Sequence, residues 1–297
     1  MKNIINIIGN TPIVELQKIK PSTNVRIFAK LEFLNPTGSH KDRAALYMIK
    51  EAIKKHNLKP GDIIVEASSG NTGISVAFVA QRFGLKTLIV IPKNTSRCKV
   101  AILKMLGAEI FEGSEDPSSS DYYIKLAEEL AKKHRGIFLN QYSNQANALA
   151  HYETTAEEIW CSLNGDIDAF VMGVGTGGTI TGVGRCLKER KKDVLIVAVT
   201  PKGSPLAGGS KGEEIEGFLS AEIPPLLDKS IIDRIVEVSY EEAKEMAMRL
   251  AREEGILAGI SSGANIAASL KIAEEVRRGN IVTIIADSVL RYIDEVE

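Results

Sequence analysis

Lys41 is the residue whose setting first calls for a chemical explanation. It lies in the segment NPTGSHKDRAA, residues 35–45, between an apolar run, RIFAKLEFL, and a helix-like run, ALYMIKEAI. A helix would ordinarily begin there with Ser or Asp as its cap. Taken alone, Lys41 would most simply be a surface charge paired with Asp42 or Glu32, so neighbouring motifs must decide its role.

A glycine-rich turn, GVGTGGT at residues 173–179, follows the apolar run AFVM and precedes a helix-like segment. Glycines allow close approach of the backbone to an anion, and free N–H groups at a helix start attract it. Thr176 and Thr179 add hydroxyl donors. The turn also matches the dinucleotide pattern GxGxxG, which requires an acidic residue about 20 positions on. The next strand ends in TPK without an acid, so we interpret the turn as a cradle for a phosphate monoester.

Two further polar turns each precede a helix-like segment. SSGNTG, residues 68–73, offers three hydroxyls, an amide and free backbone N–H groups, which suit a small carboxylate. Simple helix capping would need one such residue rather than four. GISSGAN, residues 259–265, is a weaker motif, because its serines could simply cap the following helix.

The elements that must position these motifs alternate along the chain. Near-continuous apolar strands separated by helices are typical of parallel sheets covered on both faces, and right-handed crossovers wind them into a three-layer α/β/α sandwich. The predicted strands are residues 62–67, 86–92, 109–113, 136–140, 169–173, 193–200 and 281–286. Helices are predicted within residues 71–84, 96–108, 120–134, 147–163, 180–190, 239–255 and 263–279.

The carboxyl ends of parallel strands are where open α/β sheets bind ligands. Lys41 and all three turns follow apolar, strand-like runs, so we expect them to meet in one crevice that holds a phosphate, a carboxylate and a lysine. This combination suits pyridoxal 5′-phosphate (PLP), whose aldehyde condenses with a lysine amine while its phosphate occupies a separate cradle.

Composition narrows the possible partners. The 297 residues carry a formal charge of −1, which gives no global reason to bind nucleic acid or an anionic membrane. We find no secretory signal and no apolar stretch long enough to span a membrane. The three cysteines are widely spaced and the four histidines lack metal-ligand spacing, so we expect a cytoplasmic protein without a metal site.

Seven motifs in order make the chain resemble the fold-type II PLP enzymes, within them the cysteine synthase and cystathionine β-synthase branch. They extend nearly from end to end. The motifs are IGNTPIVEL (8–16), NPTGSHKDRAA (35–45), EASSGNTGISVA (66–77), NQYSNQAN (140–147), GVGTGGTITGVG (173–184), EEGILAGISSGAN (253–265) and RYI (291–293).

The resemblance implies a role for each motif. Lys41 is expected to join the cofactor covalently as a Schiff base and to act as the catalytic base. The other expected cofactor contacts are Asn71 at the 3′-oxygen, Gly175, Thr176, Gly177, Gly178 and Thr179 at the phosphate, and Ser261 at the pyridine nitrogen. The expected substrate contacts are Ser68, Ser69, Gly70, Thr72, Gln141 and Gly217.

The resemblance also implies an architecture and a reaction. We expect two domains, each with a mostly parallel sheet, and PLP in the cleft between them. Residues 1–40 and 146–297 would form a larger cofactor domain, and residues 41–145 a smaller, mobile domain that binds the substrate carboxylate. The expected enzyme is a homodimer that makes L-cysteine from O-acetyl-L-serine, or O-phospho-L-serine, and sulfide.

Several departures leave the substrates open. His40 precedes the lysine where relatives often have an apolar residue, and we expect it to pack. Relatives commonly have Gly-Ile-Gly where this chain has Gly217-Phe218-Leu219, near the mouth of the site. A phosphoserine user would need an extra basic side chain, for which the candidates are Arg97, Lys99, Lys202 and Lys211. Alternatives are a cystathionine β-synthase, a serine dehydratase or cysteine desulfhydrase, and a catalytically idle homologue.

Overall fold

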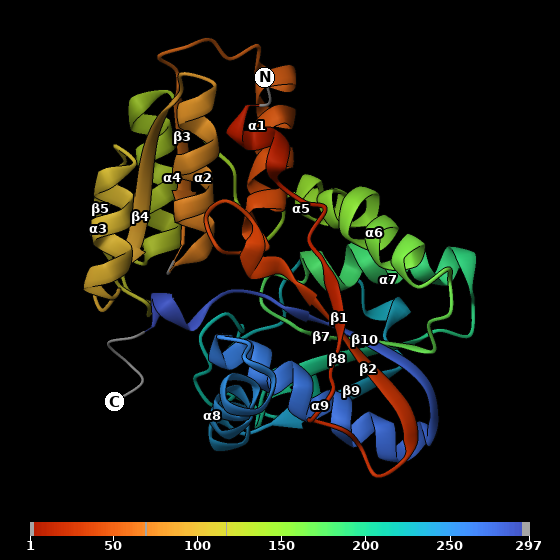
Figure 1. Ribbon diagram of the computed structural model, residues 1–297. Helices are drawn as coiled ribbons and strands as arrows, with labels where there is room; N and C mark the ends of the chain where they lie inside the picture. The colour runs from red at the N-terminus through yellow and green to blue at the C-terminus, as the bar shows by residue number, and fades with distance from the viewer. Residues whose placement is uncertain (1–2, 69, 117, 293–297) are drawn as a thin grey trace.

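Two sheets form the framework of the protein in the computed structural model, which describes residues 3–68, 70–116 and 118–292. The larger sheet has the order β1-β2-β10-β7-β8-β9, and the smaller has the order β5-β4-β3-β6. Figure 1 shows the smaller sheet above the larger one, with α1 beside the junction. The sequence prediction of two mostly parallel sheets is confirmed.

The larger sheet is parallel apart from its first strand, which pairs antiparallel with its neighbour. Its strands come from the two ends of the chain, since β2 lies beside β10 over eight residue pairs. The strands are β1 (Ile13–Glu15), β2 (Asn24–Leu31), β7 (Ala169–Gly173), β8 (Leu195–Pro201), β9 (Arg234–Val238) and β10 (Arg278–Ile285).

Alternating side chains of the larger sheet enter two separate apolar cores. Val171 and Val197 face one core with α8 (Tyr240–Arg249) and α9 (Ile260–Val276). Phe170 and Ile196 face the other core with α6 (Ala156–Ser162) and α7 (Gly178–Arg190). Burial on both faces explains why the strands read as unbroken apolar runs.

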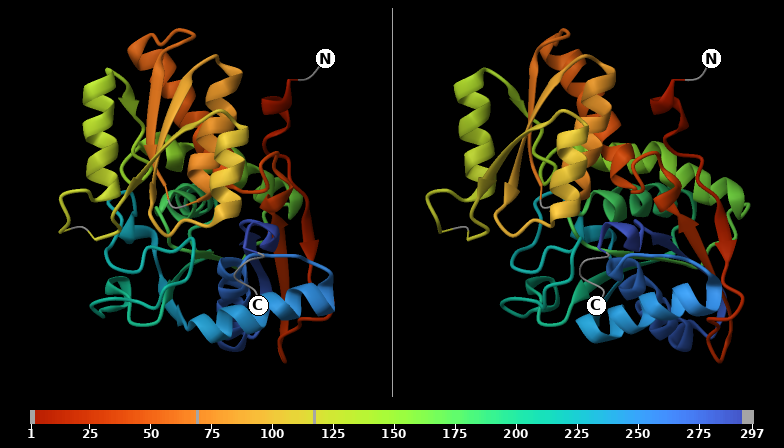
Figure 2. Two further views of the ribbon diagram at one scale, coloured as in Figure 1. Left: turned by 90° about the vertical axis from the view of Figure 1, so that its left-hand side faces the viewer. Right: turned by 60° about the vertical axis from the view of Figure 1, so that its left-hand side comes forward.

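The smaller sheet is parallel throughout its described strands and has helices on both faces. Helices α1 (Lys41–His56), α2 (Asn71–Arg82) and α3 (Arg97–Met105) supply one core, and α4 (Tyr123–His134) supplies the other. The strands are β3 (Ile63–Ala67), β4 (Lys86–Pro92), β5 (Glu109–Gly113) and β6 (Ile137–Phe138). Figure 2 shows these elements on one side of the molecule and the C-terminal helices α8 and α9 on the other.

The segment 147–163, expected as one helix, is divided in the structure. It contains part of α5 (Gln145–Ala150), a π-helical turn at His151–Thr155, and all of α6. Another π-helical turn, Leu250–Glu254, follows α8. Short 3-10 turns occupy Ile4–Ile7, Glu32–Leu34, Pro205–Ala207, Lys229–Ile231 and Val289–Arg291. In the described ranges, no helix is long and apolar enough to cross a membrane.

The sequence analysis missed two strands and wrongly expected one. Strands β1 and β9 were not predicted. The run before the GISSG turn is not a strand, because only an isolated bridge joins Ala258 to Ser288. This turn therefore reaches the site from α9 rather than from the end of a strand.

Candidate active site

Lys41 begins α1 at the junction of the two sheets. Its backbone lies beside the bridge between Ser39 and Asp287, which joins the start of α1 to the segment after β10. Burial lowers the pKa of the Lys41 amine to about 8, and the negative charge of Asp287 opposes this effect. Within the described ranges, Nζ of Lys41 makes no hydrogen bond or ion pair. The amine is therefore open to reaction with an aldehyde.

The acids expected as simple partners of Lys41 are bound elsewhere. Asp42 accepts hydrogen bonds from Thr37 N at 2.8 Å and from Ser75 Oγ at 2.7 Å. Glu32 accepts from Arg43 Nε at 2.8 Å. The alternative of Lys41 as a paired surface charge is therefore excluded, because both candidate carboxylates bind other groups.

Asn71 joins the two halves of the molecule beside this lysine. At the start of α2, its Nδ2 donates to Asp287 Oδ2 at 2.6 Å and to the Tyr292 hydroxyl at 3.1 Å. Arg291 donates to the Asn71 amide oxygen. The SSGNT segment (residues 68–72), which follows β3, is thus tied to the chain after β10. This contact brings together motifs that lie more than 200 positions apart in the sequence.

The glycines of the GVGTGGT turn pack against their surroundings with no room for a Cβ. A Cβ at Gly175 would lie 2.3 Å from Gly217 O, and one at Gly178 would lie 2.2 Å from Asn147 Oδ1. Thr176 is buried, and its Oγ1 accepts from Asn147 Nδ2 at 3.1 Å. The turn therefore presents backbone and hydroxyl groups, as an anion cradle requires.

The SSGNT segment is braced from the end of β6. Gly70 N donates to Ser68 Oγ at 3.1 Å, Thr72 Oγ1 donates to Gln141 Oε1 at 2.6 Å, and Gln141 Nε2 donates to Ala67 O at 2.9 Å. Ser69, another of the predicted substrate contacts, lies outside the described residues. Free N–H groups at the start of α2 would face a carboxylate bound here.

Ser261, near the start of α9, lies beside Gly217, in the segment between β8 and β9. A Cβ on Gly217 would lie 3.5 Å from Ser261 Cβ and Oγ. The following serine, Ser262, is held by a hydrogen bond from Ala286 N to its Oγ at 2.9 Å. The segment that contains Gly217-Phe218-Leu219 also touches the cradle, because the ring of Phe218 lies against Gly173.

Of the four basic candidates, Lys99 is the buried one, with 2% of its surface exposed. It forms an ion pair with Glu216, which precedes Gly217. A Cβ at Gly70 would lie 3.2 Å from Glu216 Oε1 and 3.5 Å from Lys99 Cε. The pair therefore bridges α3 to the loop at the predicted substrate site. The exposed candidates are Arg97, Lys202 and Lys211.

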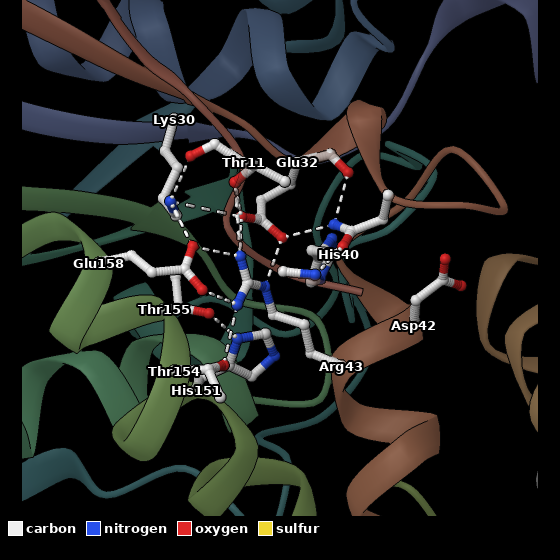
Figure 3. Close-up of polar contacts among 12 residues, drawn as sticks. Thr11, Lys30, Glu32, His40, Asp42, Arg43, His151, Thr154, Thr155 and Glu158 are labelled. Atoms are coloured by element: carbon white, nitrogen blue, oxygen red, sulfur yellow. Dashed lines mark hydrogen bonds and ion pairs between the residues drawn. The ribbon is translucent and has the colours of Figure 1, made fainter. Parts of the chain in front are cut away.

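A buried charge cluster next to Lys41 was missed by the sequence analysis. Figure 3 shows Arg43 between Glu32 and Glu158, with Lys30 alongside. Arg43 NH1 lies 2.6 Å from Glu158 Oε1, and Lys30 Nζ lies 2.7 Å from Glu158 Oε2. The available signal was the placement of Lys30 and Glu32 within an otherwise apolar run. Two cations and two anions balance one another, as burial requires.

His40 packs as expected. It is buried, its Nδ1 lies 3.2 Å from Ala286 O, and its ring centroid lies 5.8 Å from that of His151. Its pKa is lowered well below the ordinary value, chiefly by burial and then by the charge of Lys41.

Comparison with known proteins defines the class. Residues 4–287 match the family described as "Pyridoxal-phosphate dependent enzyme". The chain belongs to this family, and its fold is that of the fold-type II PLP enzymes. PLP is accordingly its cofactor.

The individual relatives are similar over nearly the whole chain. It is 43% identical to a cysteine synthase of Staphylococcus aureus, over 98% of this chain and 95% of that protein. It is also 43% identical to a cystathionine beta-synthase of Apis mellifera, over 99% of this chain, which spans 60% of that longer relative.

Solved structures give the same fold. An O-ureido-L-serine synthase superposes with a TM-score of 0.94 at 36% identity, over 100% of this chain and 96% of the other. A cysteine synthase from Entamoeba histolytica superposes with a TM-score of 0.93 at 37% identity, over 99% and 90%.

The site fits the cofactor on three structural grounds. In the described part of the chain, the Lys41 amine has no polar partner and Asp287 Oδ1 is buried without one. The glycine positions of the GVGTGGT turn have no room for a Cβ. An aldehyde, a phosphate and the polar edge of a ring would complement these three features.

Proposed function

We propose that the protein is a cysteine synthase, which replaces the β-substituent of an activated L-serine by sulfide. One juxtaposition carries this proposal: Lys41, whose amine has no polar partner in the described ranges, begins α1 beside the Ser39–Asp287 bridge, and Asn71 of the SSGNT segment binds the same Asp287. The names of the relatives support the same reaction.

The residue assignments that we propose are those that the family resemblance implies. Lys41 would hold the cofactor covalently and serve as the catalytic residue. The proposed cofactor contacts are Asn71, Gly175, Thr176, Gly177, Gly178, Thr179 and Ser261. The proposed substrate contacts are Ser68, Ser69, Gly70, Thr72, Gln141 and Gly217.

PLP, when bound, supplies an electron sink next to the substrate α-carbon. Lys41, freed when substrate binds, takes the α-proton, and its lowered pKa of about 8 leaves a useful fraction of the amine neutral near that pH. The leaving group departs from the β-carbon, a sulfur nucleophile adds there, and Lys41 returns the proton. Ser261 would hold the ring nitrogen with a neutral hydroxyl, which would favour elimination and replacement over transamination.

The substrate loop orients the amino acid. The free N–H groups at the start of α2 and the hydroxyl of Ser68 would bind the carboxylate, and Gln141 keeps Thr72 in place. Closure of the SSGNT segment on substrate would exclude water from the reacting carbon.

The donor we favour is O-acetyl-L-serine. Lys99 is the basic candidate at the substrate loop, and its charge is already balanced by Glu216. A phosphate-bearing donor would have to displace this carboxylate, whereas an acetyl ester would not. Homocysteine remains the alternative acceptor, since one relative is a cystathionine beta-synthase.

The test is a substrate matrix with purified protein. O-acetyl-L-serine, O-phospho-L-serine and L-serine are each combined with sulfide or homocysteine, and the products are quantified. We expect cysteine from O-acetyl-L-serine and sulfide at the highest kcat/KM. Faster cystathionine formation from homocysteine would overturn the choice of acceptor, and pyruvate as the main product would indicate elimination.

The role of Lys41 has its own test. Lys41→Ala should lose nearly all turnover, and borohydride treatment of the wild type should attach the cofactor to the peptide that contains Lys41. Lys50→Ala, an exposed position on the same helix, is the matched control and should retain activity. Substantial cysteine formation by Lys41→Ala would refute the assignment.

The division into domains and the quaternary state are also proposals. Residues 1–40 and 146–297 would form the cofactor domain and residues 41–145 the smaller one, a division supported by the strand membership of the two sheets. We further propose a homodimer that works in the cytoplasm. Light scattering of the purified protein tests the dimer.

A further inference from the structure

His151 is a buried histidine to which the mechanism above assigns no role. It begins the π-helical turn between α5 and α6 and has 0% of its surface exposed. Its Nδ1 lies 2.9 Å from Thr155 Oγ1, and its Nε2 lies 3.2 Å from Thr179 Oγ1. Figure 3 shows the ring next to Thr155 and below the guanidinium of Arg43. The imidazole thus stands between one structural threonine and one threonine of the phosphate cradle.

Glycines on α7 create this contact. A Cβ at Gly178 would lie 2.2 Å from Asn147 Oδ1, and one at Gly182 would lie 2.1 Å from Ala148 O. The first turns of α7 are therefore pressed against α5 and the π-helical turn. Such turns widen a helix locally and are frequent at functional sites. Together these features place the ring of His151 at the Thr179 hydroxyl.

The ring is held in its neutral form. Burial lowers the pKa of His151 well below the ordinary value, and the charges of Arg43 and Lys41 lower it further. A neutral imidazole has one N–H donor and one acceptor nitrogen. The two threonine hydroxyls then decide which nitrogen carries the proton.

Because Thr179 has a single hydroxyl hydrogen, only one tautomer of His151 lets Thr179 bind an anion. A hydroxyl has a single hydrogen, and Thr179 can give it to a phosphate only if its oxygen accepts from His151. Nε2 must then carry the proton, and Nδ1 must accept from the Thr155 hydroxyl. The reverse tautomer would take the Thr179 hydrogen and turn an oxygen lone pair toward the anion.

We propose that His151 is a positioning residue for the cofactor phosphate: as its Nε2–H tautomer, fixed by Thr155, it keeps the Thr179 hydroxyl hydrogen directed into the cradle. This inference rests on the proposed assignment of Thr179 to the phosphate, and it extends that assignment to two residues that touch neither cofactor nor substrate.

Two substitutions of His151 test whether the position of its hydrogen-bond donor matters, rather than the size of the side chain alone. In His151→Gln, the side-chain NH2 can occupy the place of Nε2–H and still donate to Thr179. In His151→Asn, the shorter amide reaches the place of Nδ1 and leaves Thr179 without a donor. Thr155→Val removes the group that fixes the tautomer while keeping the imidazole. His134→Asn, at an exposed position, is the matched control.

The measurement is the dissociation constant of each apoprotein for PLP and for pyridoxal, which has the same aldehyde and ring but no phosphate. His151→Asn should bind PLP at least about tenfold more weakly than the wild type, the scale of one hydrogen bond to a charged group. Its affinity for pyridoxal should be unchanged. His151→Gln should stay near the wild type, and Thr155→Val should fall between them. The phosphorus resonance of bound PLP should shift in His151→Asn and not in His151→Gln.

Other results would contradict either the role of His151 or the phosphate cradle itself. Equal weakening of PLP and pyridoxal, or equal effects of Asn and Gln, would reduce His151 to a structural role and overturn the inference. If His151→Asn does not fold, Thr155→Val supplies the same comparison. Wild-type protein that binds PLP no better than pyridoxal would instead overturn the cradle assignment. The proposed reaction is judged separately, from turnover.

Discussion

The substitution Glu32→Gln tests how the buried charge cluster beside the active-site lysine stabilises the fold. Glu32 has 0% exposure and accepts from Arg43 Nε and NH2 at 2.8 Å each and from Thr11 Oγ1 at 2.6 Å. Burial alone would raise the pKa of this carboxyl, but the charges and hydrogen bonds of Arg43, with Lys30, outweigh burial and lower it to about 2.

The magnitude follows from that pKa. A carboxyl whose pKa falls from 4.5 to about 2 contributes roughly 3 kcal/mol to the free energy of unfolding in its charged form. Gln keeps the shape but removes the charge, so Arg43 and Lys30 are left with Glu158 alone. Breaking a buried ion pair by removing one partner typically costs about 3–5 kcal/mol. We therefore expect Glu32→Gln to lower the free energy of unfolding by about 3 kcal/mol near neutral pH.

Urea unfolding of both proteins measures the difference. The matched control is Glu253→Gln, which removes an exposed helical ion pair with Arg249 and should cost no more than about 0.5 kcal/mol. Because the folded-state pKa of Glu32 lies below its unfolded value, its contribution is full above about pH 4.5 and is lost as the pH falls toward 2. The gap between wild type and Glu32→Gln should therefore narrow over that range. A loss below about 1 kcal/mol, or a gap that does not change with acidification, would refute the reasoning.

Three further predictions concern the active site. Gly178→Ala should yield a folded protein that retains little PLP, because its Cβ would lie 2.2 Å from Asn147 Oδ1; a full cofactor content would contradict the close-packed cradle. Glu216→Gln should raise the ratio of kcat/KM for O-phospho-L-serine to that for O-acetyl-L-serine by about tenfold, because Lys99 would regain an unbalanced charge; an unchanged ratio would count against Lys99 as a phosphate contact. Apoprotein should take up PLP faster as the pH rises through about 8, the lowered pKa of the Lys41 amine, and then level off; a rate that climbs well beyond that pH would indicate an ordinary lysine.

Strands and helices buried on both sides of the sheets were predictable from the sequence. β4 and β7 have the expected bounds, because a parallel strand between two helical layers must be apolar throughout. The edge strand β5 also has the expected bounds, although its burial is only partial. β9 was missed because RIVEV lies at an edge and is mostly exposed, so its composition resembles that of a loop. The π-helical turn at His151–Thr155 was missed because it continues from α5 into α6 without a gap, so the segment looks like a single helix.

The sequence by itself determined which chemical groups the protein has and at which turns they stand. Lys41, the glycine–threonine turn and the SSGNT segment were recognisable because each is a local pattern of residue types. Only the tertiary structure decided which of these groups are paired. Glu32 binds Arg43 rather than Lys41, Lys99 meets Glu216 across 117 positions, and His151 meets Thr179 across 28. Hydrogen bonds between elements depend on how those elements pack, and neither periodicity nor spacing along the chain records that packing.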